Sequence, residues 1–126
     1  MKFYKCSVCG NVIEKLYDSS APVSCCGKPM DELKAGVTDA AQEKHVPACE
    51  IKDGKLFVQV GSVEHPMTKE HHIAFIIAKA GDIVMRKELT PEDKPVAEFC
   101  LNGYKGNVEV YEYCNLHGLW KADITA

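Results

Sequence analysis

The chain has 126 residues, of which 46% are hydrophobic and 26% charged, and this is the composition of an ordinary globular protein with one domain or two very small ones. Its net charge of −3 and its scattered lysines and arginines argue against a nucleic-acid partner. No apolar run approaches the roughly 18 residues that span a bilayer, and the N-terminal residues lack the apolar core of a signal peptide, so we expect a cytoplasmic protein with no membrane partner.

A change in composition near Lys34-Ala35-Gly36 divides the chain into two domains, which we expect to cover residues 1–36 and 37–126. The first part holds four cysteines within 21 residues, and the second holds longer apolar runs with β character. A segment of roughly 35 residues buries too little apolar surface to fold securely alone, so we expect a metal ion to hold it together. Cysteines in a reducing cytoplasm indicate metal ligands or buried thiols rather than disulfides.

The second part is predicted to be rich in β-strands. A short helix-compatible stretch, Asp39–Lys44, is stopped by the following Val46-Pro47. An Asp53-Gly54 turn signal then opens a series of β-prone segments at roughly ten-residue spacing, which is typical of a sandwich. The predicted strands are Lys55–Val60, His71–Lys79, Asp82–Glu88, Pro95–Leu101, Asn107–Tyr113 and Leu119–Ile124.

The N-terminal cysteines have the spacing of a metal site. Cys6 and Cys9 are separated by two residues, so their thiolates can hold one ion, and Gly10 permits the bend that follows. The second pair, Cys25 and Cys26, is adjacent, whereas a zinc ribbon normally repeats Cys-x-x-Cys. Adjacent ligands require local distortion. We predict a tetrathiolate metal centre; its adjacent pair resembles that of the desulforedoxin-type iron centre, which implies iron, and a structural zinc is the alternative.

A second candidate site draws on residues far apart in the sequence. Cys114 and His117 lie three positions apart on a predicted loop, and three upstream histidines, His45, His65 and His71, stand in suggestive contexts. A single histidine is more often a surface or hydrogen-bonded core residue than a ligand. Zinc seldom needs five protein ligands, whereas iron accepts imidazole together with thiolate and keeps a further position for chemistry.

These motifs occur together, and in this order, in one known family. They are Glu43-Lys44-His45-Val46-Pro47, His65-Pro66-Met67, Glu70-His71 and Cys114-Asn115-Leu116-His117-Gly118, preceded by the four cysteines. Over essentially its whole length the chain resembles desulfoferrodoxin, the two-iron superoxide reductase. The resemblance implies a desulforedoxin-like four-cysteine metal domain over residues 1–36. It also implies an immunoglobulin-like β-sandwich, the superoxide reductase (neelaredoxin-like) domain, over residues 37–126.

The resemblance also implies the function and the role of each site residue. The chain would be an enzyme that reduces superoxide to hydrogen peroxide at a non-haem ferrous iron, with electrons from a rubredoxin-like donor, and would form a homodimer. Four equatorial histidines and an axial thiolate would hold this iron: His45, His65, His71, His117 and Cys114. Glu43 would bind the open position in the ferric state, and Lys44 would lie exposed beside it. Cys6, Cys9, Cys25 and Cys26 would hold a second iron.

Four further residues have other predicted places. Cys49 and Cys100 match no ligand position and are most simply small buried apolar residues. His72 should point away from His71 if both lie on a strand. Trp120 is predicted to pack near the Cys-x-x-His loop. Backbone amides of residues 115–117 are further candidates, as donors to the Cys114 sulfur.

Two other functions remain open on the residues alone. One is an electron-transfer or redox-sensing protein without turnover, against which an open position beside a lysine argues, because outer-sphere electron transfer needs no vacancy. The other is a zinc-ribbon interaction module attached to a β-domain. Visible absorption separates the last from the others, because iron–thiolate sites absorb visible light and zinc sites do not.

Overall fold

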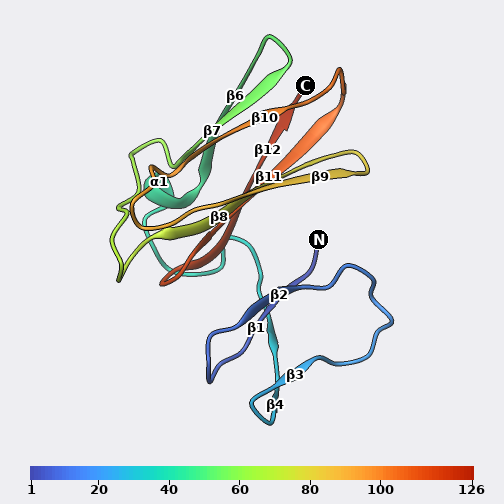
Figure 1. The fold of residues 1–126 in the computed structure, drawn as a ribbon, viewed down its shortest axis with the longest axis vertical. Helices are drawn as coiled ribbons and strands as arrows, with labels where there is room; N and C mark the ends of the chain where they lie inside the picture. The colour runs from blue at the N-terminus through green and yellow to red at the C-terminus, as the bar shows by residue number, and fades with distance from the viewer. The chain divides into compact units, whose positions relative to one another are not determined.

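The computed structural model describes all of residues 1–126 and divides into two compact units, Met1–Lys34 and Ala35–Ala126 (Figure 1). The regular secondary structure of both units consists of antiparallel strands, with the exception of one four-residue helix, α1 (Gln42–His45). The structure has no helix with the length and apolar character needed to cross a membrane. The mainly β fold class predicted from the sequence is confirmed.

The N-terminal unit contains two small sheets. Strands β1 (Phe3–Lys5), β2 (Val12–Glu14) and β5 (Asp31–Glu32) form one sheet in the order β2-β1-β5. Strands β3 (Ser24–Cys25) and β4 (Lys28–Pro29) form a separate hairpin. The unit buries only two large apolar side chains apart from its cysteines, Phe3 and Met30. So small a core leaves stability to depend on other links.

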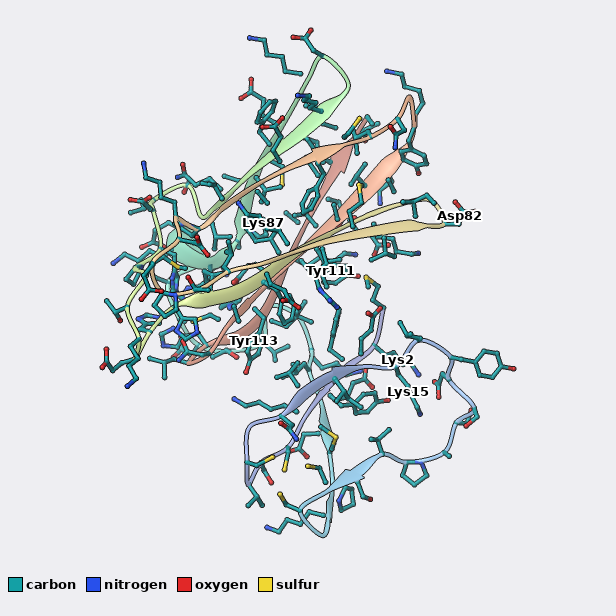
Figure 2. All side chains as sticks on the ribbon, viewed as in Figure 1. Lys2, Lys15, Asp82, Lys87, Tyr111 and Tyr113 are labelled. Carbon is teal, nitrogen blue, oxygen red and sulfur yellow. The ribbon has the colours of Figure 1, made fainter.

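One such link is an ion-pair cluster around Asp18. The ammonium groups of Lys2 and Lys15 each lie 2.7 Å from a carboxylate oxygen of Asp18 (Figure 2). Lys15 also donates to the carbonyl of Ala21, and the Ser20 amide donates to Asp18. These contacts tie the long loop between β2 and β3 to the first residues of the chain.

The C-terminal unit is a sandwich of two antiparallel sheets (Figure 1). The first has the order β10-β7-β6 and comprises β6 (Pro47–Lys52), β7 (Lys55–Val60) and β10 (Val96–Cys100). The second has the order β12-β11-β8-β9 and comprises β8 (Ile73–Ala80), β9 (Ile83–Glu88), β11 (Asn107–Cys114) and β12 (Gly118–Thr125). The predicted β-sandwich is therefore confirmed.

The core of the sandwich follows from strand alternation. Along β7, Leu56, Val58 and Val60 are buried while the residues between them are exposed. From the other sheet, Val108 and Val110 of β11 join the same cluster. Glu112 continues this inward-facing row and is fully buried, and neither of its carboxylate oxygens has a hydrogen-bond partner. Burial raises the pKa of Glu112 well above its usual value, because it disfavours the charged form of the carboxyl group.

The six predicted strands all exist, with ends within two residues of those expected. The sequence did not predict β6, whose residues Pro47–Lys52 include a single β-branched side chain, Ile51. This edge strand forms because it pairs along its whole length with β7, from Pro47 opposite Val60 to Lys52 opposite Lys55. Proline is tolerated at the first residue of an edge strand. The five short strands of the N-terminal unit were not predicted either.

A register shift lies where β11 approaches the end of the sandwich. Tyr113 pairs with Phe75 of β8, but the next residue, Cys114, pairs with Ile73. The extra residue on β8 is Ala74, which has no partner on β11. Such bulges re-aim side chains next to functional sites, and here the shift lies directly at a cysteine that the sequence marks as a candidate ligand.

Candidate metal centres

Five candidate ligands from separate segments meet at one end of the sandwich. His45 is the last residue of α1, His65 follows the turn after β7, and His71 lies two residues before β8. Cys114 ends β11, and His117 lies in the loop to β12. One ligand atom from each residue lies within 4.8 Å of all the others. His71 was predicted to be on a strand, and the structure places it in the preceding loop.

Two of the rings are oriented by hydrogen bonds to backbone carbonyls. His45 Nδ1 donates to the carbonyl of Ala41 and His65 Nδ1 to that of Pro66, each over 2.7 Å. Because a carbonyl only accepts, both neutral rings carry their proton on Nδ1 and present the lone pair of Nε2. These two Nε2 atoms lie 3.2 Å apart, facing the shared centre.

The other two rings complete the set without such support. His117 presents Nδ1, which lies 3.1 Å from His45 Nε2 and 3.9 Å from Cys114 Sγ. His71 Nε2 is buried and has no hydrogen-bond partner. A buried nitrogen without a partner and lone pairs held about 3 Å apart are unfavourable unless a cation lies between them. The donor set therefore fits a metal ion, and the mixture of imidazoles with one thiolate fits iron.

The protonation state of the histidines suits this role. Burial lowers the pKa of His65 to about 4, and it also lowers the pKa values of His45 and His71. For His65 the bond to Pro66 opposes the shift, and the neighbouring histidines add to it. These three imidazoles are therefore neutral at pH 7, as metal ligation requires.

Trp120 closes one side of the five-ligand centre. Its ring stacks on that of His45, with centroids 5.0 Å apart and an angle of 26°. Its indole N–H donates to the carbonyl of His117 over 3.1 Å. The side chain is almost fully buried, so it excludes water from the side of the cluster that it covers. The predicted packing of Trp120 beside the Cys-x-x-His loop is confirmed.

Glu43 and Lys44 lie on α1 immediately before His45, and both are exposed. The Glu43 carbonyl accepts hydrogen bonds from the Val63 amide (2.9 Å) and the Ser62 hydroxyl (3.3 Å). Lys44 lines a surface cavity of about 450 Å³ that His65 also lines. No acidic group forms an ion pair with Lys44. The ammonium therefore lies exposed beside His65 without an ion-pair partner.

The four N-terminal cysteines form a second cluster, whose sulfur atoms lie within 4.8 Å of one another. The first pair forms a turn in which the amides of Val8 and Cys9 donate to Cys6 Sγ, each over 3.4 Å. These two bonds lower the pKa of Cys6 to about 6, and the bond from the Cys9 amide has the larger effect. Gly10 follows with φ of 81°, a conformation that suits glycine.

The adjacent pair converges through an unusual backbone conformation. Cys26 and Gly27 form the two-residue turn between β3 and β4, and both have positive φ, 53° and 73°. This turn accounts for the distortion expected of neighbouring ligands. Hydrogen bonding with Cys9, and then with Cys25, raises the pKa of Cys26 to about 12. Four clustered thiols cannot all ionise without a cation, and a bound metal ion would remove this penalty.

The residues predicted to be outside both sites are outside them. His72 does not join the cluster, and its ring bonds to the carbonyl of Thr68 instead. All seven cysteines are free of disulfides, and Cys49 packs against the sandwich core. The prediction that Cys100 is buried is wrong: it is exposed, because outward-facing positions of β10 face solvent. The Asn115 amide, a candidate donor to the Cys114 sulfur, donates to the carbonyl of His72 over 3.2 Å.

The sequence did not reveal two contacts that support the five-ligand centre, one made by the Asn115 side chain and one by Gly61. Asn115 binds the segment around His71 through its side chain. Gly61 lies against the backbone of residues 43–45, so closely that a Cβ atom there would lie 2.6 Å from the Glu43 carbonyl oxygen. In the sequence these contacts are marked only by a glycine directly after a predicted strand and an asparagine next to a candidate ligand. Neither pattern is specific to a metal site.

Comparison with known proteins finds matches along nearly the whole chain. The family model of desulfoferrodoxin matches residues 37–123, and that of the desulfoferrodoxin N-terminal domain matches residues 1–33. The desulfoferrodoxin of Syntrophotalea carbinolica is 45% identical over 98% of this chain and 96% of its own, and that of Clostridium acetobutylicum is 48% identical over 91% and 90%. The crystal structure of the superoxide reductase from Treponema pallidum superposes with a TM-score of 0.77 at 34% identity, covering 96% of this chain and 97% of that one. The chain therefore belongs to the desulfoferrodoxin family.

Proposed function

We infer that this chain is a superoxide reductase, an oxidoreductase that converts superoxide to hydrogen peroxide. The observation that carries the inference is the convergence of four imidazoles and one thiol on a single point, with the His71 nitrogen buried and without a partner. In the reaction superoxide accepts one electron and two protons and becomes hydrogen peroxide. When bound, ferrous iron would supply the electron and the position at which superoxide binds.

We propose His45, His65, His71, His117 and Cys114 as the ligands of that iron. The proposal draws on the proximity of their donor atoms, the lowered pKa values of three of the imidazoles, and the two carbonyl bonds that fix the rings of His45 and His65. Second partners of this kind fix the tautomer and the direction of a ligating ring. The thiolate would donate electron density to the iron, as thiolate does in some haem enzymes.

Metal analysis combined with a superoxide assay tests the function. The iron-loaded, reduced protein should consume superoxide and form one hydrogen peroxide per superoxide, with no oxygen released. A dismutase would form half as much peroxide together with oxygen, and an electron-transfer protein would show no second-order reaction with superoxide. Either of these outcomes, with the five-ligand centre fully loaded, would refute the proposed activity.

We propose that Lys44 attracts superoxide and helps to organise water for proton delivery. Its ammonium is exposed, has no ion-pair partner and lines the cavity beside His65. A fixed cation near a binding site raises the association rate of an anion by about tenfold or more at low salt. Glu43, its neighbour on α1, is proposed to reach the iron only in the ferric state.

We predict that Lys44→Ala slows the reaction with superoxide by about tenfold at low ionic strength and flattens its dependence on salt. Pulse radiolysis over a range of salt concentrations measures both effects. Glu43→Ala is the matched control, because it changes an adjacent charge on α1: it should alter the ferric absorption spectrum and leave the rate near that of the parent. Parental rates of Lys44→Ala at every salt concentration would contradict the role of the lysine.

The N-terminal unit is proposed to be a desulforedoxin-like domain over residues 1–36, with the superoxide reductase domain over residues 37–126. Cys6, Cys9, Cys25 and Cys26 would hold a second iron, and zinc is the alternative there. A rubredoxin-like electron donor, a homodimer and a cytoplasmic location remain proposals. The last is supported by the seven free thiols, which a reducing compartment maintains. Sedimentation analysis of the iron-loaded protein tests the dimer.

A further inference from the structure

The five-ligand centre joins two loops that are far apart in the sequence. One loop carries Cys114 and His117, and the other carries His71, about 43 residues earlier. The side chain of Asn115 connects them. The His72 amide donates to Asn115 Oδ1 over 2.8 Å, and Asn115 Nδ2 donates to the carbonyl of Glu70 over 2.9 Å. One side chain therefore binds the backbone on both sides of His71.

The orientation of this amide group is fixed by its partners. The oxygen faces an N–H group and the nitrogen faces a carbonyl, so the reverse orientation would place donor against donor and acceptor against acceptor. The backbone of Asn115 adds a third link, because its N–H donates to the carbonyl of His72 over 3.2 Å. The two loops are thus held in one register by three hydrogen bonds.

His71 is the ligand that most needs such support. The rings of His45 and His65 are each oriented by a bond from Nδ1 to a carbonyl, and the carbonyl of His117 is held by the Trp120 indole. The ring of His71 has no hydrogen bond of its own, and its buried Nε2 has no partner. The backbone of His71 itself bonds only to Thr68 of the same short loop: its amide donates to the Thr68 hydroxyl oxygen, and its carbonyl accepts from the Thr68 amide and hydroxyl. The place of His71 therefore depends on what holds its backbone.

We propose that Asn115 is a positioning residue that holds His71 in the metal centre. The proposal rests on the five-ligand iron centre of the proposed function. In this proposal the Asn115 side chain, and not only its backbone amide, links the Cys114–Gly118 loop to the segment around His71. Loss of the two side-chain bonds leaves the backbone bond between Asn115 and His72 but loosens the 70–72 segment relative to Cys114, and a ligand nitrogen displaced in this way binds the iron more weakly.

Two substitutions separate the two bonds. Asn115→Asp keeps the shape and the acceptor for the His72 amide, but places a carboxylate oxygen against the Glu70 carbonyl. Asn115→Leu keeps the approximate volume and removes both bonds. Asn107→Ala is the matched control, because Asn107 begins β11, the strand that Asn115 follows, and its side-chain bond goes to Asp123, away from the centre.

The main measurement is the rate at which a chelator removes iron from the five-ligand centre. Iron release should be about 10–100-fold faster in Asn115→Leu, and faster than in the parent in Asn115→Asp, while Asn107→Ala should behave as the parent. The absorption of the four-cysteine centre in the same chain provides an internal reference and should not change. Amide exchange of His72 in the metal-free protein should accelerate in Asn115→Leu and remain slow in Asn115→Asp.

A double-mutant cycle with His71→Ala separates positioning from a general effect on folding. If Asn115 acts through His71, Asn115→Leu should add nothing to the iron-release rate of His71→Ala. Independent, multiplicative effects of the two substitutions would overturn the proposal, as would parental iron release in the Asn115 variants. If Asn115→Leu does not fold, Asn115→Asp tests the proposal by itself. Iron release at the parental rate from this variant would show that the bond to the Glu70 carbonyl is not needed to hold His71. None of these measurements uses superoxide, so a failure of the proposed activity would be seen separately, in the parent.

Discussion

Replacement of Gly61 by alanine should disturb the segment that carries three site residues. Gly61 directly follows β7, and a Cβ atom there would lie 2.6 Å from the Glu43 carbonyl oxygen, 2.9 Å from the Lys44 carbonyl carbon and 3.0 Å from the His45 nitrogen. All three are backbone atoms, so no flexible side chain can give way. The difference between 2.6 Å and the 3.4 Å at which ordinary contact begins is 0.8 Å. The α1 backbone must move by an amount of that order.

The expected cost is that of an overpacked site, roughly 1–3 kcal/mol. At roughly 4 °C for each kcal/mol, the melting temperature of the C-terminal unit should fall by roughly 4–12 °C. The shift also reaches His45, whose ring contributes to the metal centre, and Lys44, whose ammonium is proposed to attract superoxide. We therefore expect a superoxide rate constant at least about tenfold lower than that of the parent, since displacements near 1 Å at a reacting site cost up to about 100-fold.

Thermal unfolding and pulse radiolysis of the iron-loaded variant measure the two effects. Val58→Ala is the matched control: Val58 is buried on the same strand, so its loss destabilises the sandwich through a cavity without touching α1. The control should lower the melting temperature and keep the parental rate constant. A Gly61→Ala protein with the parental melting temperature and rate constant would refute the argument that this contact positions α1.

Three further predictions concern other parts of the chain. Cys9→Ser should abolish the visible absorption of the four-cysteine centre and leave the first reaction with superoxide unchanged in rapid-mixing experiments; loss of that reaction in a folded variant would mean that the two centres are coupled. In the iron-loaded protein at pH 8, iodoacetamide should alkylate the exposed Cys100 and spare Cys49. Burial raises the pKa of Cys49 to about 11, so roughly 0.1% of this thiol is ionised at that pH. Equal labelling of the two cysteines in peptide mass spectra would contradict this. The hydrogen bond from Lys121 (2.9 Å) lowers the pKa of Glu109 from its usual value of 4.5. The ion pair therefore stabilises the folded protein above pH 4.5, and this stabilisation is lost as the pH falls through the lowered pKa of the folded state. Glu109→Gln should therefore unfold more easily at pH 7, by at most about 1 kcal/mol, and match the parent near pH 3 in urea titrations, whereas a difference independent of pH would exclude the ion pair as its cause.

The amino-acid sequence determined the features that depend on local chemistry. Alternation along Lys55–Val60 and the Asp53-Gly54 turn before it specify a half-buried strand, and the structure has that strand at the same residues. The short spacing between Cys6 and Cys9 marks ligands that neighbouring backbone can bring together without help from the rest of the fold. The motifs around His45, His65 and Cys114 identify the family because the residue types stand in the chain itself.

The tertiary structure decided what depends on contacts between distant segments. β6 has weak β propensity and forms because β7 offers a complete ladder of partners. Cys100 is exposed because its strand turns that position to solvent, which its residue type does not reveal. The convergence of the five ligands depends on which loops meet at one end of the sandwich, and on close contacts such as those of Gly61 and Asn115. Such contacts join segments far apart in the sequence, so neither period nor propensity encodes them, and only the folded chain brings the donor atoms within reach of one ion.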